Sequence, residues 1–205
     1  MGKRHNPRAE RGGETPGQTN RVRIIGGEHR GRRLGFPSVP GLRPTPDLVR
    51  ETLFNWLQPV LPGAVCLDLF AGSGALGLEA ASRGAGRVTM VDSSAVVAAQ
   101  IRENVKLLRL KQVRVEQADA SSWLERTTPE PADIVFLDPP YDDGNLLEAS
   151  CTLLERGGWL KSDARIYIEV EAGSPLATPC ALWNQIRQKR SGKVCYSLYS
   201  NRRPG

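Results

Sequence analysis

The tetrapeptide Asp138-Pro139-Pro140-Tyr141 follows an apolar run, residues 134–137, that is typical of a buried strand. Proline cannot continue a strand, so the chain must turn there and present the acid and the aromatic ring together. The Asp138 carboxylate and the Pro139 carbonyl can accept hydrogen bonds from an exocyclic amine, while the Tyr141 ring can stack on a flat heterocycle. This combination suits a nucleobase that has left its helix. We predict that these four residues form a catalytic site, with an incidental proline-rich loop as the structural alternative.

A second motif lies upstream, where an apolar strand ends at Asp68 and runs into a turn of small residues. Its glycines let the backbone bend tightly and approach a ligand, and they also satisfy the G-x-G-x-x-G pattern of dinucleotide sites. A carboxylate inside the turn would repel a pyrophosphate, but it can bind the ammonium group of S-adenosylmethionine. The motif therefore favours the methyl donor. The residues predicted to contact it here are Asp68, Phe70, Gly72, Ser73 and Gly74.

Two further acids follow later predicted strands. Residues 87–91 lead into Asp92, which is placed to accept hydrogen bonds from the hydroxyls of a ribose, with Ser93 beside it. Asp119 follows the next predicted strand and, with Ala120, can meet the adenine amine. A helix N-cap explains Asp119 equally well. These four residues complete the predicted cofactor site.

These acids need a scaffold that brings several strand ends together. Apolar runs alternate with helical patterns, which predicts a doubly wound α/β sheet whose ligands gather at the carboxyl ends of its strands. Two alternating segments near the C-terminus predict an antiparallel hairpin that brings the sheet to seven strands. The predicted strands lie near 65–69, 87–91, 112–117, 133–137, 164–170, 183–190 and 194–199, and the predicted helices near 46–57, 75–83, 94–109, 120–127 and 144–156.

The first of these helices precedes the glycine turn. Pro46 suits its first turn, and Thr45 is the predicted cap. The apolar residues expected near one face are Leu48, Leu53, Phe54 and Leu57.

Positive charge is concentrated near the N-terminus. The whole chain has a formal charge of +6, and residues 1–36 alone contain nine Lys/Arg and three Asp/Glu. The rest of the chain is therefore neutral. A basic arm on a neutral body indicates that the arm meets a polyanion while the body carries out chemistry, although a solvated tail without a partner is the simpler alternative.

The arm divides into two parts. Residues 1–20 lack hydrophobic periodicity and are predicted to be a disordered basic tail. Residues 21–36 are predicted to form a β-hairpin around Gly26-Gly27, and residues 37–205 the catalytic domain. Alternation in the first strand separates arginines from apolar side chains, so the hairpin can lie on the body and present arginines to RNA phosphates. The predicted RNA contacts are Arg21, Arg23, Arg30, Arg32 and Arg33, with Arg43 and Arg50 near the catalytic mouth.

Several classes of protein are excluded by composition. No segment approaches eighteen apolar residues and no signal peptide is evident, which predicts a soluble, cytoplasmic protein without a membrane partner. The four cysteines are scattered, and both histidines lie in the basic arm, so no metal site is expected. Nothing indicates an obligate oligomer, and a monomer is predicted.

These motifs together resemble those of a known family. Asp68-x-Phe70-x-Gly72-x-Gly74, Asp92, Asp119 and residues 138–141 occur in the order of the S-adenosylmethionine-dependent amino-methyltransferases. The segments that are similar to the bacterial RsmD family are 23–27, 30–32, 41–45 and 49–57, and the resemblance spans roughly residues 21–200. One departure is Asp92, where relatives often have glutamate, and either acid can bind a ribose.

The resemblance implies a seven-stranded, Rossmann-like class I methyltransferase fold with a small N-terminal β-hairpin extension. It also implies that S-adenosylmethionine is the cofactor and that the substrate is the exocyclic N2 amine of a guanine in 16S rRNA. The family further implies an assembled or partly assembled small ribosomal subunit as the partner.

Three alternatives remain open from the residues alone. The catalytic turn does not distinguish guanine N2 from adenine N6 or cytosine N4, so a DNA adenine-N6 methyltransferase can use the same site. A release-factor glutamine methyltransferase fits less well, because that group usually has Asn where Asp138 stands. A non-catalytic RNA-binding protein with a methyltransferase-like fold would not bind S-adenosylmethionine.

Overall fold

The computed structural model describes residues 20–140, 144–173 and 182–201. The predicted disordered tail, apart from Asn20, and the predicted catalytic Tyr141 lie outside these residues. Within the described part of the chain, no helix is long and apolar enough to cross a membrane. The same residues contain no cluster of three or more His, Cys, Asp or Glu side chains that could hold a metal ion.

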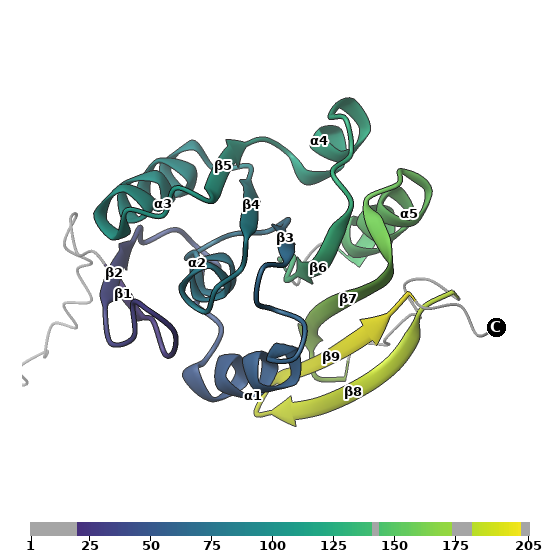
Figure 1. The fold of residues 1–205 in the computed structure, drawn as a ribbon, viewed down its shortest axis with the longest axis horizontal. Coiled ribbons are helices and arrows are strands. Elements are labelled where there is room, and N and C mark those ends of the chain that lie inside the picture. Colours follow the sequence, from purple (N-terminus) through teal and green to yellow (C-terminus); the bar gives the residue numbers. More distant parts are fainter. Residues whose placement is uncertain (1–19, 141–143, 174–181, 202–205) are drawn as a thin grey trace, which may run out of the picture.

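The central sheet has seven strands in the order β5-β4-β3-β6-β7-β9-β8 (Figure 1). Strands β3 to β7 all run parallel to one another. Strands β8 and β9 form an antiparallel hairpin that pairs with β7 through β9 and completes one edge of the sheet. The strands are β3 (Val65–Asp68), β4 (Arg87–Asp92), β5 (Val113–Gln117), β6 (Ala132–Leu137), β7 (Leu160–Glu171), β8 (Asn184–Ser191) and β9 (Val194–Ser200). The predicted seven-stranded Rossmann-like sheet is confirmed.

Helices cover both faces of this sheet. They are α1 (Asp47–Leu57), α2 (Ala75–Ser82), α3 (Ala95–Leu108), α4 (Ala120–Arg126) and α5 (Gly144–Arg156). Successive strand residues point to opposite faces, so Cys66 belongs to the apolar core beneath α1, α2 and α3, and Leu67 to the core beneath α4 and α5. The inner strands β3 and β6 are covered on both faces, so each contains a continuous apolar run.

Helix α1 differs in detail from the prediction. It begins at Asp47, and the side chain of Thr45 does not cap it. Leu48 is 65% exposed, whereas Val49 is fully buried. The buried stripe runs through Val49 and Leu53, which are four residues apart, and Leu48 falls outside it. The predictions that Thr45 caps the helix and that Leu48 shares its apolar face were therefore wrong.

The N-terminal arm forms a separate two-stranded antiparallel sheet, with β1 (Asn20–Arg23) paired to β2 (Arg33–Phe36). The predicted hairpin is confirmed, but its connection is not a tight turn at Gly26-Gly27, because residues 24–32 all lie between the strands. Val22 and Ile24 are buried in the core that also contains α1, α2 and α3. The arm is therefore packed against the body through its apolar face, as its alternating pattern predicted.

Candidate functional site

The acids predicted to form the site all lie at the carboxyl ends of neighbouring strands. Asp68 ends β3, Asp92 ends β4, and Asp138 directly follows β6. Strand β3 lies between β4 and β6, so its end is adjacent to both of the others. Asp119 follows β5, the neighbour of β4 on the outer side. The fold thus brings together acids that are spread over about seventy residues of sequence.

The glycine turn between β3 and α2 is tied to both neighbouring acids. The Gly72 amide donates to Asp92 Oδ2 at 2.8 Å, and the Gly77 amide donates to Asp68 Oδ2 at 2.9 Å. Gly72 and Gly74 have φ angles of 51° and 79°, in the left-handed region that favours glycine. A Cβ at Gly77 would lie 2.8 Å from the Met90 side chain. Glycine is therefore required both for the turn and for the close packing of α2 on β4.

Asp68 is only 1% exposed. Burial raises the pKa of its carboxyl group to about 7; the hydrogen bond from Gly77 lowers the pKa, and the negative charge of Asp92 raises it. The carboxylate therefore holds the start of α2 as well as facing the turn, a structural role that the motif alone did not reveal. Its predicted contact with an ammonium group stays a prediction.

Asp92 is half-buried, and each of its oxygens accepts one backbone hydrogen bond. Oδ2 accepts from Gly72 and Oδ1 from Ser94, both at 2.8 Å. Burial raises the pKa of this carboxyl group, and the two amide hydrogen bonds lower it. Each carboxylate oxygen can accept a second hydrogen bond. The geometry therefore leaves Asp92 able to accept hydrogen bonds from a diol.

Asp119 is the N-cap of α4, where its Oδ1 accepts from the Ser122 amide at 2.9 Å. The capping interpretation of this residue is confirmed. Asp119 and Ser93 are exposed, Phe70 is partly exposed, and Ser73 and Ala120 are buried. The capping hydrogen bond occupies Oδ1 of the carboxylate. The contact between an adenine amine and the other oxygen, Oδ2, stays a prediction.

The predicted cofactor residues share one chemical property. Their side chains include acids at the ends of three neighbouring strands and no cation. S-adenosylmethionine presents donors to such a surface: an ammonium, two ribose hydroxyls and an adenine amine. A dinucleotide would bring a pyrophosphate, which these acids would repel. The set of acceptors therefore fits the methyl donor better than a nicotinamide cofactor.

Asp138 is half-buried at the end of β6. The Thr45 hydroxyl donates to its Oδ2 at 3.5 Å. Burial raises its pKa well above the ordinary value, as do the charges of Glu169 and Asp68, while the Thr45 hydrogen bond lowers the pKa. A carboxylate with a raised pKa is a better proton acceptor near neutral pH. The predicted catalytic acid therefore lies in an environment suited to accepting a proton.

Glu169 is a buried acid beside Asp138 that the sequence analysis missed. Leu137 pairs with Ile168 between β6 and β7, so Asp138 and Glu169 occupy the next positions of the two strands. The Tyr167 hydroxyl donates to Glu169 Oε2 at 2.6 Å. Glu169 and Tyr167 are two residues apart in β7, so their side chains point to the same face of the sheet. Only the register between strands reveals that this face is also that of Asp138.

The prediction that Arg50 contacts RNA is wrong, because its side chain is completely buried. Its Nε donates to the Thr45 carbonyl at 3.0 Å, and its Nη1 donates to Glu79 Oε2 at 3.3 Å. Its Nη2 is paired with Asp47. Arg50 follows Val49 on the buried face of α1, so its charge is neutralised inside the protein. The other arginines predicted to bind RNA are exposed: Arg21, Arg23, Arg30, Arg32, Arg33 and Arg43.

Glu79 on α2 is a second residue that the sequence analysis missed. Its carboxylate accepts from the amides of Ile25 and Gly26 at 2.8 and 2.7 Å. It also pairs with Arg50 and Arg83. One fully buried acid therefore connects the arm, α1 and α2, and fixes the connection between β1 and β2.

Several known proteins are similar to this chain. Residues 22–200 match the model of a family described as "Conserved hypothetical protein 95". Ribosomal RNA small subunit methyltransferase D of Escherichia coli strain K12 is 48% identical over 188 residues, which cover 91% of this chain and 93% of that protein. The protein of the same name in Haemophilus influenzae is 44% identical over 191 residues, covering 92% and 98%. A solved structure described as putative methyltransferase yhhF from Escherichia coli has a TM-score of 0.83 and 45% identity, over 90% of this chain and 100% of that chain.

Proposed function

Because the chain belongs to the family described as Conserved hypothetical protein 95, the RsmD family that its motifs resemble, we propose that it methylates the exocyclic N2 amine of a guanine in 16S rRNA. The chain is a methyltransferase by family and by fold. The observation that carries the proposal is the position of Asp138, whose carboxylate lies at a strand end next to the acid-lined glycine turn. The substrate is an assembled or partly assembled small ribosomal subunit in the cytoplasm, and the protein acts as a monomer.

The cofactor of this reaction is S-adenosylmethionine. When bound, it supplies a methyl group on a sulfonium, and the sulfur keeps the bonding electrons as a neutral thioether. Asp92 would accept hydrogen bonds from the ribose hydroxyls and Asp119 from the adenine amine, while Phe70 and the glycine turn would line the site. Asp68, at the end of β3, would contribute negative charge toward the ammonium.

Asp138 and the Pro139 carbonyl orient the target amine. A guanine amino lone pair is delocalised into the ring and is poorly nucleophilic, so the amine must be turned until this lone pair faces the methyl carbon. Acceptors at Asp138 hold it there and stabilise the positive charge that grows on nitrogen as the new C–N bond forms. The methylated nitrogen then releases a proton, which either Asp138 or water accepts. Tyr141 stacks on the extruded base, a contact of roughly 1–3 kcal/mol.

The exposed arginines of the arm bind RNA phosphates. Arg21, Arg23, Arg30, Arg32 and Arg33 are all exposed on the hairpin or on its connection, and Arg43 precedes α1. Each phosphate contact releases counterions, so these residues make binding depend on salt concentration. They set the orientation of the RNA, while Asp138 and Pro139 act on the base.

The proposed function predicts the loss of one modified nucleoside. Deleting the gene removes N2-methylguanosine from one position of 16S rRNA, as measured by nucleoside mass spectrometry, and the wild-type gene restores it. Restoration by an Asp138→Ala gene would contradict the assigned site. Loss of N6-methyladenine from DNA, with rRNA unchanged, would favour the adenine methyltransferase instead.

The affinity for S-adenosylmethionine is expected to rise between about pH 5.5 and about pH 7.5. The pKa of the Asp68 carboxyl group is raised to about 7, so this group changes from neutral to charged within that interval. The charged form attracts the ammonium, and affinity changes by up to about tenfold for each pH unit below that pKa. Isothermal titration calorimetry measures this dependence, which Asp68→Asn is expected to abolish. An equal pH dependence in that variant would rule out Asp68 as its source.

A further inference from the structure

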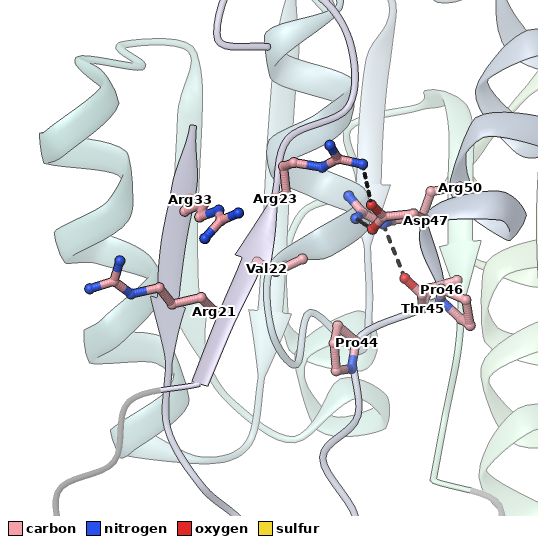
Figure 2. Close-up of a pocket in the computed structure, with 9 residues that line it drawn as sticks. All are labelled: Arg21, Val22, Arg23, Arg33, Pro44, Thr45, Pro46, Asp47 and Arg50. Carbon is pink, nitrogen blue, oxygen red and sulfur yellow. Dashed lines mark hydrogen bonds and ion pairs between the residues drawn. The ribbon is translucent and has the colours of Figure 1, made fainter. Parts of the chain in front are cut away.

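A pocket of about 320 Å³ lies between the hairpin and the start of α1 (Figure 2). Small-ligand pockets have volumes of roughly 300–1,000 Å³, so this one has room for about one nucleotide. It is lined by Arg21, Val22, Arg23, Arg33, Pro44, Thr45, Pro46, Asp47 and Arg50. Three of these arginines are among the exposed residues of the arm, which ties the pocket to the proposed RNA surface.

The charge of this pocket favours an anion. Its one acid, Asp47, is already paired with both Arg23 and Arg50. Within the described part of the chain, no hydrogen bond or ion pair engages the guanidinium groups of Arg21 and Arg33, which extend from the two strands in Figure 2. Arg23 and Arg33 are directly opposite in the register of β1 and β2. Like charges in that arrangement are destabilising; Asp47 offsets the charge of Arg23, and a bound phosphate would offset that of Arg33.

The remaining walls of the pocket are apolar. Its apolar lining residues are Val22, Pro44 and Pro46. These apolar groups cannot donate hydrogen bonds to a phosphate, but they can pack against a sugar or a base. Arginine guanidinium groups also stack on flat rings. The lining therefore matches a nucleotide, with its phosphate on the arginines and its ring against the prolines.

Thr45 connects the pocket to the proposed catalytic acid. It lines the pocket, and its hydroxyl donates to Asp138 Oδ2. Its carbonyl accepts from the buried Arg50 at 3.0 Å, so this wall is fixed by a residue that cannot move into solvent. Thr45 is therefore both part of the pocket lining and a direct contact of the Asp138 carboxylate. We propose that the pocket binds a nucleotide of the RNA strand next to the target guanine, with its phosphodiester held by Arg21 and Arg33.

This site rests on the proposed function and adds a role to it. A neighbouring nucleotide held in the pocket fixes the register of the strand, so that one particular base reaches Asp138. Misplacement of a reacting group by about 1 Å can lower a rate by about 10²-fold. Loss of the pocket contacts is therefore expected to lower kcat in addition to weakening RNA binding. General charge attraction would change only the binding.

Two double variants with the same change in charge test the site. Arg21→Ala/Arg33→Ala empties the pocket of its unpaired arginines, whereas Arg30→Ala/Arg32→Ala removes two exposed arginines from residues 24–32, which do not line it. Both variants are expected to raise KM and to weaken its dependence on KCl. Only the first is expected to lower kcat, by about tenfold or more. The substrate is small subunits from cells that lack the gene, and affinity for S-adenosylmethionine serves as the folding control.

A binding measurement separates this inference from the proposed function. Uridine 5′-monophosphate, followed by NMR with saturating S-adenosylmethionine, is expected to bind the wild type and Arg30→Ala/Arg32→Ala, but not Arg21→Ala/Arg33→Ala. Equal effects of the two variants on KM, kcat and nucleotide binding would overturn the pocket and leave the methyltransferase proposal intact. Selective nucleotide binding by a protein that methylates no rRNA would support the pocket and overturn the proposed function.

Discussion

Asp138→Ala is expected to lower kcat for rRNA methylation by about 10²–10³-fold, with affinity for S-adenosylmethionine within about twofold of wild type. In the proposed mechanism the carboxylate orients the target amine and stabilises the positive charge that develops on it, so removing the carboxylate raises the free energy of the transition state. In the proposed site the cofactor would contact Asp92, Asp119 and the glycine turn, and none of these contacts involves Asp138. Single-turnover kinetics gives the rate of the chemical step, and calorimetry gives the cofactor affinity.

Two further variants separate charge from position at this site. Asp138→Asn keeps an acceptor oxygen and is expected to retain more activity than Asp138→Ala. Activity of the wild type is expected to rise with pH through the raised pKa of Asp138, because only the charged carboxylate can accept a proton. Glu169→Gln removes a negative charge and so shifts this rise to lower pH. Wild-type kcat in Asp138→Ala would show that the reaction does not need this carboxylate.

Arg50→Met is expected to lower the free energy of unfolding by about 3–5 kcal/mol. Arg50 and Glu79 are both completely buried, and Arg50 also holds the Thr45 carbonyl and pairs with Asp47. Removing one partner of a buried pair leaves the other charge partly uncompensated, and this accounts for most of the cost. The effect is large because the same acid also holds the arm to the body.

Urea unfolding followed by circular dichroism measures this change. Arg43→Ala is the matched control, because Arg43 is an exposed arginine close to the same helix. It is expected to change the stability by no more than about 0.5 kcal/mol. If Arg50→Met were as stable as Arg43→Ala, the network around Glu79 would contribute nothing to the fold.

Local patterns in the sequence predicted most of the fold correctly. The glycine turn after Asp68 and the apolar runs before Asp92 and Asp138 each specify a strand and its end within a few residues. Helix and strand boundaries followed because periodicity, prolines and glycines act over short distances. The predictions that Thr45 caps α1 and that Leu48 lies on its apolar face were wrong, because the first residue of a helix and its orientation depend on packing as well as on local preference.

The sequence by itself determined the strands, the order of the acids along them and the family to which the chain belongs. These are properties of short segments, in which neighbouring residues decide the backbone conformation. The tertiary structure alone decided that Arg50 is buried, that Glu169 stands beside Asp138, and that Thr45, 93 residues earlier in the chain, reaches the same carboxylate. Such contacts depend on strand register and on how helices pack over the sheet, and no local pattern encodes either of them.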